Sequence, residues 1–238
     1  MSELSFSVVI PAAGIGKRVG ADIPKQYLSI LDKTIIEHSI TPFLAHPDIN
    51  QVIVSIAPND QWFNRLKLAK HPKLKIVAGG KERVDSVLSA LKHLPGDDYV
   101  LVHDAARPCL QLSDINKLIA HAKATKTGAM LACRVRDTMK RTDKNNQVEH
   151  TVERENLWHA LTPQMFNNQQ LITAISTVQD LHLITDEASA IELAGGLITI
   201  IEGRSDNLKV TQLEDLLLAE FYLSKFSTNS NCYVKEKI

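Results

Sequence analysis

This chain of 238 residues has no excess of charge of either sign, few aromatic side chains, three cysteines and no long hydrophobic run. Lysine and arginine together number 27, and so do aspartate and glutamate. Electrostatic binding to nucleic acid or to an anionic membrane needs a basic excess, so we expect neither partner. No apolar run approaches the roughly 20 residues of a membrane span. A ligand that carries phosphate must therefore be bound by a local cluster of charge.

The three cysteines, Cys109, Cys133 and Cys232, are odd in number and widely spaced, and no CxxC pair is present. This pattern argues against a disulfide framework and against a zinc ribbon. The first residues, MSELSFSVVIPAAG, have neither the basic leader nor the small-residue cleavage site of a signal peptide. We therefore expect a reducing, cytoplasmic compartment.

Short apolar segments alternate with helical patterns along most of the chain. Nearly continuous apolar runs, typical of parallel strands covered on both faces, occur at Phe6–Pro11, Val52–Ala57, Leu74–Ala78, Tyr99–Val102, Ala129–Cys133 and Leu197–Ile201. Helical spacing of apolar residues occurs at Ile35–Leu44, Arg83–Leu94, Leu112–Ala124, Gln169–Leu181 and Leu213–Phe226, with a short capped helix ending near Ala194. The alternation predicts one α/β domain, residues 1–238, built on an open doubly wound sheet.

The polar segment Arg136–Leu161 interrupts this alternation. Asp143–Asn146 is a good turn between two strand-like arms, Asp137–Thr142 and Gln147–Glu153. A hairpin with polar flanks does not suit a buried sheet, so we expect it to project. It is either a surface decoration or an arm that exchanges onto a second subunit.

A glycine-containing segment, PAAGIGKR, directly follows the first predicted strand. It matches neither the P-loop, which needs Ser or Thr where Arg18 stands, nor the GxGxxG dinucleotide motif, which needs closer glycines. Its small residues still let backbone N–H groups approach a polyphosphate; they are Ala12, Ala13, Gly14 and Gly16. The cations Lys17, Arg18 and Lys25 follow, which suits a site where charge develops on departing pyrophosphate. The alternative is an ordinary solvated turn.

Three further clusters come where predicted strands end, which is where α/β folds bind ligands. Gly79–Ser86 joins paired glycines to a helix N-terminus, which favours an anion, although a plain strand–helix turn has the same pattern. Asp104 follows a buried strand and suits Mg²⁺ binding together with phosphate oxygens, or the capping of a turn. Asp206 and Lys209 follow the last strand and could reach the same crevice, and Asp206 suits helix entry equally well.

Taken together and in order, these motifs resemble one known family. The matching runs are PAAGIGKR, PKQY, GGKERVDSV, VHDAARP, RDTMKR, TVERENLWHALTPQ, TDEASA and EGRSDNLKVT, from about Val8 to Phe226. The sequence is similar to the 2-C-methyl-D-erythritol 4-phosphate cytidylyltransferases. The resemblance implies a Rossmann-like three-layer nucleotidyltransferase fold with a mostly parallel sheet and a projecting β-hairpin arm. It also implies transfer of a cytidylyl group from CTP to methylerythritol phosphate, with release of pyrophosphate and with Mg²⁺.

The resemblance also implies roles for particular residues. Arg18 and Lys25 would be catalytic, and the nucleotide would contact Ala12, Ala13, Gly14, Gly16, Gly80, Ser86 and Ala105. Methylerythritol phosphate would contact Arg107, Thr138, Arg154, Thr162 and Lys209. Asp104, and as a second candidate Asp206, would bind the metal. A homodimer formed through the 136–161 arm would complete each site. A cytidylyltransferase for another polyol phosphate, such as ribitol 5-phosphate, is the alternative.

Overall fold

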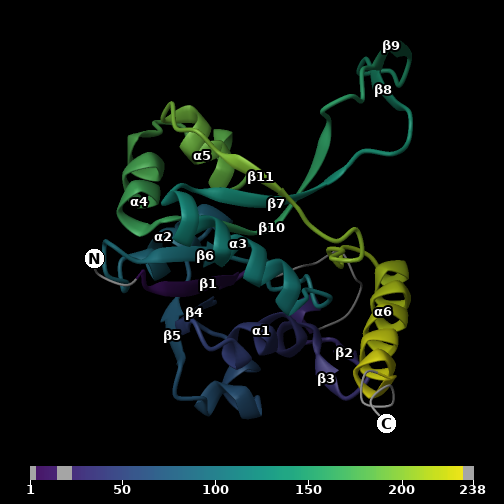
Figure 1. Cartoon of the computed structure of the whole chain (residues 1–238). Helices are drawn as coiled ribbons and strands as arrows, with labels where there is room; N and C mark the ends of the chain where they lie inside the picture. The colour runs from purple at the N-terminus through teal and green to yellow at the C-terminus, as the bar shows by residue number, and fades with distance from the viewer. Residues whose placement is uncertain (1–3, 15–22, 233–238) are drawn as a thin grey trace.

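The computed structural model of the chain describes residues 4–14 and 23–232, with side chains as far as residue 226. Within these ranges a seven-stranded sheet lies at the centre of the molecule (Figure 1). Across the sheet its strands are β11 (Thr199–Glu202), β7 (Ala129–Arg134), β10 (Trp158–Asn167), β6 (Tyr99–Val102), β1 (Phe6–Ala12), β4 (Ile49–Ile56) and β5 (Leu74–Ala78). Of these strands only β10 is antiparallel to its neighbours. The predicted α/β class with a mostly parallel sheet is confirmed.

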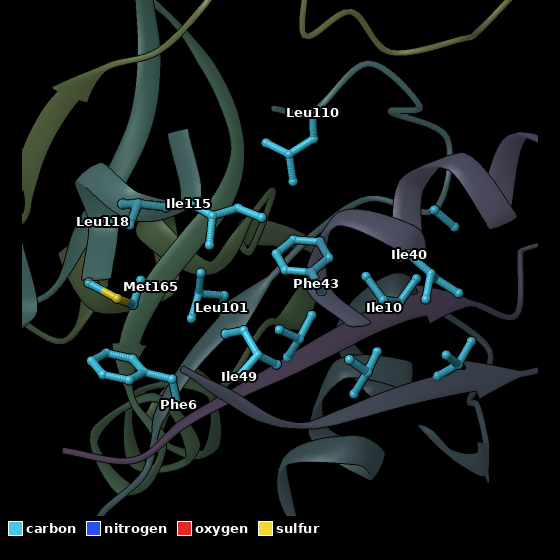
Figure 2. Packing of buried hydrophobic residues seen from close by; sticks show 14 of the residues in the cluster. Phe6, Ile10, Ile40, Phe43, Ile49, Leu101, Leu110, Ile115, Leu118 and Met165 are labelled. Carbon is cyan, nitrogen blue, oxygen red and sulfur yellow. The ribbon is translucent and has the colours of Figure 1, made fainter. Parts of the chain in front are cut away.

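Helices cover both faces of this sheet. One face packs against α1 (Ile35–Ala45) and α3 (Leu112–Thr125), and the other against α2 (Arg83–Leu91), α4 (Asn168–Thr177) and α5 (Glu187–Leu193). Successive side chains of a strand point to opposite faces, so Val8 and Ile10 of β1 enter the first core and Val9 enters the second. Figure 2 shows Ile10 in the same cluster as Ile40 and Phe43 of α1. Burial on both faces explains why β1, β4 and β6 are almost continuously apolar in sequence, while the edge strands β5 and β11 are largely exposed or half-buried.

The last helix, α6 (Leu213–Cys232), lies apart from both faces. It packs against the small hairpin of β2 (Ser29–Ile30) and β3 (Lys33–Thr34). Short 3₁₀ turns complete the described elements: η2 (Lys25–Tyr27), η3 (Phe63–Arg65), η4 (Lys67–Lys70) and η5 (Leu181–Leu183). None of the helices in the described ranges is both long and apolar enough to span a membrane.

Strand β10 is the main departure from the expected elements. The polar segment ending at Leu161 was expected to belong to the arm, but Trp158 pairs with Arg134 and Ala160 with Ala132 inside the central sheet. The ladder is irregular between Ala160 and Gln164. Pro163 stands within this irregularity, where a residue without an N–H is tolerated. Because its sequence is polar and contains proline, this strand inside the sheet was not predicted from the sequence.

The predicted hairpin forms a two-stranded sheet of its own, β8 (Met139–Thr142) with β9 (Val148–Val152). It stands away from the rest of the chain at the upper right of Figure 1. Its turn is the predicted one, because Asp143 Oδ1 accepts from the backbone N–H groups of Asn145 and Gln147, each at 2.9 Å. Asn146 has φ 64°, a conformation that asparagine tolerates better than most residues.

Candidate functional site

A cleft opens at the carboxyl ends of β1 and β6. The chain runs from β1 to β4 and β5 on one side of the sheet and then returns to β6 on the other side of β1. Such a reversal of strand order leaves a crevice that binds ligands in open α/β sheets. The cleft encloses about 670 Å³, part of it open to solvent. Its lining comes from segments far apart in sequence: residues 11–14, 25–26, 80–83, 86, 104–106 and 209.

The loop after β1 is held by a buried side chain from a neighbouring turn. Gln26 Nε2 donates to the carbonyl oxygens of Ala12, at 3.0 Å, and Gly14, at 3.3 Å. A Cβ atom at Gly14 would meet nothing within 4 Å. The packing of the described residues therefore does not require a glycine here, and its lack of a side chain leaves space in the cleft. Gly16, Lys17 and Arg18 lie outside the described residues.

The loop before α2 lies directly against the loop after β1. A Cβ atom at Gly79 would lie 2.4 Å from Ala13 Cβ and 2.9 Å from Ser86 Oγ. Gly80 donates its N–H to Ser86 Oγ at 3.1 Å. The two loops can therefore adjoin only because residue 79 has no side chain, and Ser86 holds the second loop while it also lines the cleft.

The charge of the cleft favours an anion. Among the described lining residues the cations are Lys25, Lys81, Arg83 and Lys209, and the carboxylates are Glu82 and Asp104. Lys25 Nζ donates to Val210 O at 3.0 Å, and Val210 N donates to Ala106 O at 2.8 Å. The segment after β11 is thereby fixed beside Lys25, so that cations distant in sequence are concentrated at one place. A polyphosphate is the ligand class that such a cluster suits.

Asp104 lies at the centre of this cluster with both carboxylate oxygens engaged. Oδ1 accepts from Arg83 Nε at 3.1 Å, and Oδ2 from Lys209 Nζ at 2.9 Å and Arg107 Nε at 3.4 Å. Burial alone would raise the pKa of this carboxyl group, but the attraction of Arg83, Lys209 and Arg107 outweighs it and holds the pKa well below its usual range. Asp104 is therefore an anion at any physiological pH.

The donor set limits how a divalent cation can be held. A carboxylate offers about four lone-pair sites, and the three cations leave Asp104 room for one metal bond. In the described part of the chain no three His, Cys, Asp or Glu side chains are grouped as a metal site. Asp206 does not line the cleft, and its carboxylate instead pairs with Arg204. Asp104 therefore fits Mg²⁺ as a single protein ligand, with phosphate oxygens and water supplying the rest.

A second cavity of about 390 Å³ adjoins the cleft and shares Arg83, Asp104 and Lys209 with it. Its further lining is Arg107, Ala160, Leu161, Thr162, Gln164, Thr185 and Asp186. The structure therefore brings three predicted substrate-binding residues together: Arg107, Thr162 and Lys209. Arg107 Nη1 is held by Asn207 O at 2.7 Å, and Asn207 Nδ2 donates to Thr162 O at 2.8 Å.

His103 supports this second cavity from behind. It is fully buried, with Nδ1 at 2.9 Å from Thr162 Oγ1 and Nε2 at 3.2 Å from Arg107 O. Burial lowers the pKa of its imidazole to about 4, against smaller opposing contributions led by Asp104. A neutral, fully hydrogen-bonded imidazole holds the backbone and hydroxyl of its neighbours, which is a structural role.

Thr138 and Arg154 are not brought to the cleft of their own chain. Both are exposed, beside the hairpin that stands away from the body of the molecule (Figure 1). Arg154 Nη1 donates to the carbonyl oxygen of Arg136, at the start of the arm. Neither residue lines the two described cavities. Any contact they make with a substrate must therefore involve another copy of the chain or a movement of the arm.

Sequence reasoning missed two residues that organise the cleft, Gln26 and Arg83. Both lie inside quoted motifs, PKQY and GGKERVDSV, but nothing in the sequence shows what their side chains contact. Gln26 bonds the loop after β1, and Arg83 bonds both Asp104 and Glu187. These partners are far from them in sequence, so only the folded chain reveals the contacts.

Comparison with known proteins agrees with the motifs. The family model of 2-C-methyl-D-erythritol 4-phosphate cytidylyltransferase matches residues 6–225. The protein of that name from Pseudoalteromonas atlantica is 54% identical over 224 residues, which cover 94% of this chain and 97% of the relative. The one from Vibrio atlanticus is 55% identical over 225 residues, which cover 93% and 96%.

Solved structures give the same result. The crystal structure of Francisella tularensis 2-C-methyl-D-erythritol 4-phosphate cytidylyltransferase is similar with a TM-score of 0.78 and 35% identity, covering 92% of this chain and 99% of that one. A crystal structure of a 4-diphosphocytidyl-2C-methyl-D-erythritol synthase gives a TM-score of 0.81 and 33% identity, covering 93% and 100%. The residues matched by the family model, 6–225, include the sheet, the cleft and the arm.

Proposed function

We propose that this chain, which belongs to the 2-C-methyl-D-erythritol 4-phosphate cytidylyltransferase family, is an enzyme that joins CTP to 2-C-methyl-D-erythritol 4-phosphate. The products are 4-diphosphocytidyl-2-C-methyl-D-erythritol, a precursor in isoprenoid biosynthesis, and pyrophosphate. The observation that carries this proposal is the pair of adjoining cavities with a common wall of Arg83, Asp104 and Lys209. A reaction between two phosphate compounds needs such a junction, because the attacking oxygen and the phosphorus must meet.

In this reaction a phosphate oxygen of the polyol phosphate attacks the α-phosphorus of CTP in line, and the bond from that phosphorus to the leaving pyrophosphate breaks. Lys25 and Arg18 stabilise the negative charge that develops. Ala12, Ala13, Gly14, Gly16, Gly80, Ser86 and Ala105 contact the nucleotide. Arg107, Thr162 and Lys209 bind the phosphate of the second substrate in the smaller cavity.

Asp104 takes the metal role. It would hold Mg²⁺, which would supply positive charge next to the phosphates. Three cations already surround Asp104, so its carboxylate would be a single protein ligand to that ion. Asp206 is the weaker candidate, since Arg204 occupies its carboxylate.

The arm completes the site in a homodimer. Thr138 and Arg154 are exposed and away from their own cleft, so in this proposal they reach the polyol phosphate bound by a second copy. Shortening the hairpin by replacing residues 139–152 with a two-residue turn should then give a folded monomer without activity. Sedimentation together with far-UV circular dichroism checks this outcome, and a shortened chain that remains an active dimer would contradict the arm's role. The cytoplasmic location stays a prediction.

The reaction itself is tested by pyrophosphate release from CTP with a panel of polyol phosphates, with and without Mg²⁺. We expect release with 2-C-methyl-D-erythritol 4-phosphate in the presence of Mg²⁺, and at least about tenfold lower kcat/KM with ribitol 5-phosphate, a difference of about 1.4 kcal/mol in transition-state binding. A preference for ribitol 5-phosphate would contradict the proposed substrate, and release with no polyol phosphate would contradict the transfer.

A further inference from the structure

Two carboxylates on opposite sides of Arg83 form a chain of ion pairs at the wall between the cavities. Arg83 is the first residue of α2, and its Nη1 and Nη2 donate to Glu187 Oε1 and Oε2 at 2.6 and 3.0 Å. Its remaining polar nitrogen, Nε, donates to Asp104 Oδ1 at 3.1 Å. Residues from α5, α2 and the end of β6 are therefore joined through one guanidinium group.

Glu187 is the first residue of α5, a position that favours a carboxylate, and it is buried. Its side chain is 3% exposed, and it does not line either described cavity. A buried carboxylate is costly unless a cation and hydrogen bonds compensate it, and Arg83 supplies both in a bidentate pair. Because Glu187 does not face a ligand, its influence on the site passes through Arg83.

The rigid geometry of the guanidinium group lets the bonds to Glu187 orient the Arg83 donor that contacts Asp104. Arginine carries its donors in a rigid planar fork, so the bond pair to Glu187 fixes the plane in which Nε lies. Asp104 Oδ1 accepts from this Nε, while Oδ2 accepts from Arg107 and Lys209. Lysine at position 83 would keep one positive charge but could not bond both carboxylates with this geometry.

Asp104 is the group whose orientation Arg83 and Glu187 would fix. It lines both cavities, and one lone pair remains for a ligand after its three ion pairs are counted. We propose that Arg83, held by Glu187, is a positioning residue that fixes the direction in which Asp104 faces the reacting phosphates. This inference rests on the proposed function, to which it adds an action of Arg83 and Glu187 through Asp104.

The test is a double-mutant cycle on kcat with Arg83→Lys, Glu187→Gln and Asp104→Asn. Because misplacement of a reacting group costs up to about a hundredfold, we expect Arg83→Lys and Glu187→Gln each to lower kcat about tenfold to a hundredfold. In the Asp104→Asn background Arg83→Lys should have almost no further effect, since it acts through the residue already removed. Lys123→Gln, which breaks an exposed ion pair with Asp48, is the control and should leave kcat within about twofold.

Two results would overturn the proposal. Independent, multiplying losses of kcat would mean that Arg83 acts on the substrates itself. Reduced thermal stability with unchanged kcat in Arg83→Lys and Glu187→Gln would mean that the ion pairs serve the fold alone. The same cycle on the calorimetric affinity for magnesium pyrophosphate needs no turnover, so it tests Arg83 even if the wild-type chain transfers no cytidylyl group. Additive losses of affinity there would also count against positioning.

Discussion

The cleft and the arm both carry polar groups proposed to bind phosphate, but these groups are placed in opposite ways. In the cleft Gln26 and Asp104 are held by contacts within their own chain, Gln26 by the loop after β1 and Asp104 by three cations. In the arm Thr138 and Arg154 are exposed, and the hairpin projects from the body (Figure 1). In the proposed function, the cleft is built from one chain, and the arm acts on the cleft of a second copy.

This difference predicts how each region responds to substitution. Changes in the cleft alter both activity and stability, because its residues pack and pair in the interior. Changes in the arm alter activity alone, because exposed side chains contribute little to the free energy of unfolding. The following experiments test that contrast, beginning with the largest effect.

The largest effect is expected at Lys25. Lys25→Ala removes a fixed cation from the place where negative charge develops, so turnover should fall by about 10² or more. Steady-state pyrophosphate release measures it, and Lys70→Ala, at an exposed position in η4, is the control. Turnover within about threefold of wild type would remove Lys25 from the catalytic machinery.

The next effect concerns stability at acid pH. The folded chain lowers the pKa of His103 to about 4 from 6.5, so the unfolded chain binds a proton over that interval and the folded chain does not. The stability that depends on neutral His103 is therefore complete above pH 6.5 and is lost as pH falls toward 4, by about 3 kcal/mol in all. Urea unfolding at a series of pH values should show this loss, and His103→Gln should flatten it. An unchanged slope in His103→Gln would contradict the assignment.

A matched pair of glycine substitutions separates packing from ligand space. Gly79→Ala places a Cβ atom 2.4 Å from Ala13 Cβ, whereas Gly14→Ala meets nothing within 4 Å. Gly79→Ala should lower the free energy of unfolding by about 1–3 kcal/mol. Gly14→Ala should leave it within about 0.5 kcal/mol and raise only the KM for CTP. Equal stability of the two variants in urea would show that the loops do not pack as closely as described.

The smallest effect on stability is expected in the arm. Arg154→Ala removes an exposed side chain whose described bond goes to the Arg136 carbonyl, so the free energy of unfolding should change by less than about 0.5 kcal/mol. Activity should nevertheless fall by about a hundredfold, because in the proposed homodimer Arg154 contacts the phosphate of the polyol substrate. A stability loss as large as that of Gly79→Ala would place Arg154 in the fold rather than in a shared site.

Much of this arrangement could be predicted from the sequence, and the failures have physical causes. Parallel strands buried on both faces have an unmistakable apolar composition, so most of the sheet was found. Strand β10 was missed because polar residues, Thr162 and Gln164, and Pro163 interrupt its buried apolar residues, so that only its pairing with β6 and β7 identifies it as a strand. Arg83 was missed for a related reason, since its two carboxylate partners lie 21 and 104 positions away.

The same limit applies to Asp206. Its place after the last strand suggested a metal ligand, but Arg204, two positions earlier, occupies its carboxylate. Composition and spacing thus identify where a ligand binds, while the pairing of individual charges depends on the folded chain. For Thr138 and Arg154 the structure of one folded chain does not identify the groups that they contact in the proposed dimer.

Complementation between inactive variants tests the central claim that a cleft and a partner's arm form one site. Lys25→Ala chains have a defective cleft, and Arg154→Ala chains have a defective arm. After unfolding and refolding together in equal amounts, the mixture should recover about a quarter of wild-type activity, because half of the dimers are mixed and one of their two sites is intact. A mixture of Lys25→Ala with Asp104→Asn, both defective in the cleft, should recover none. No recovery with Lys25→Ala and Arg154→Ala, despite demonstrated mixed dimers, would contradict the shared site.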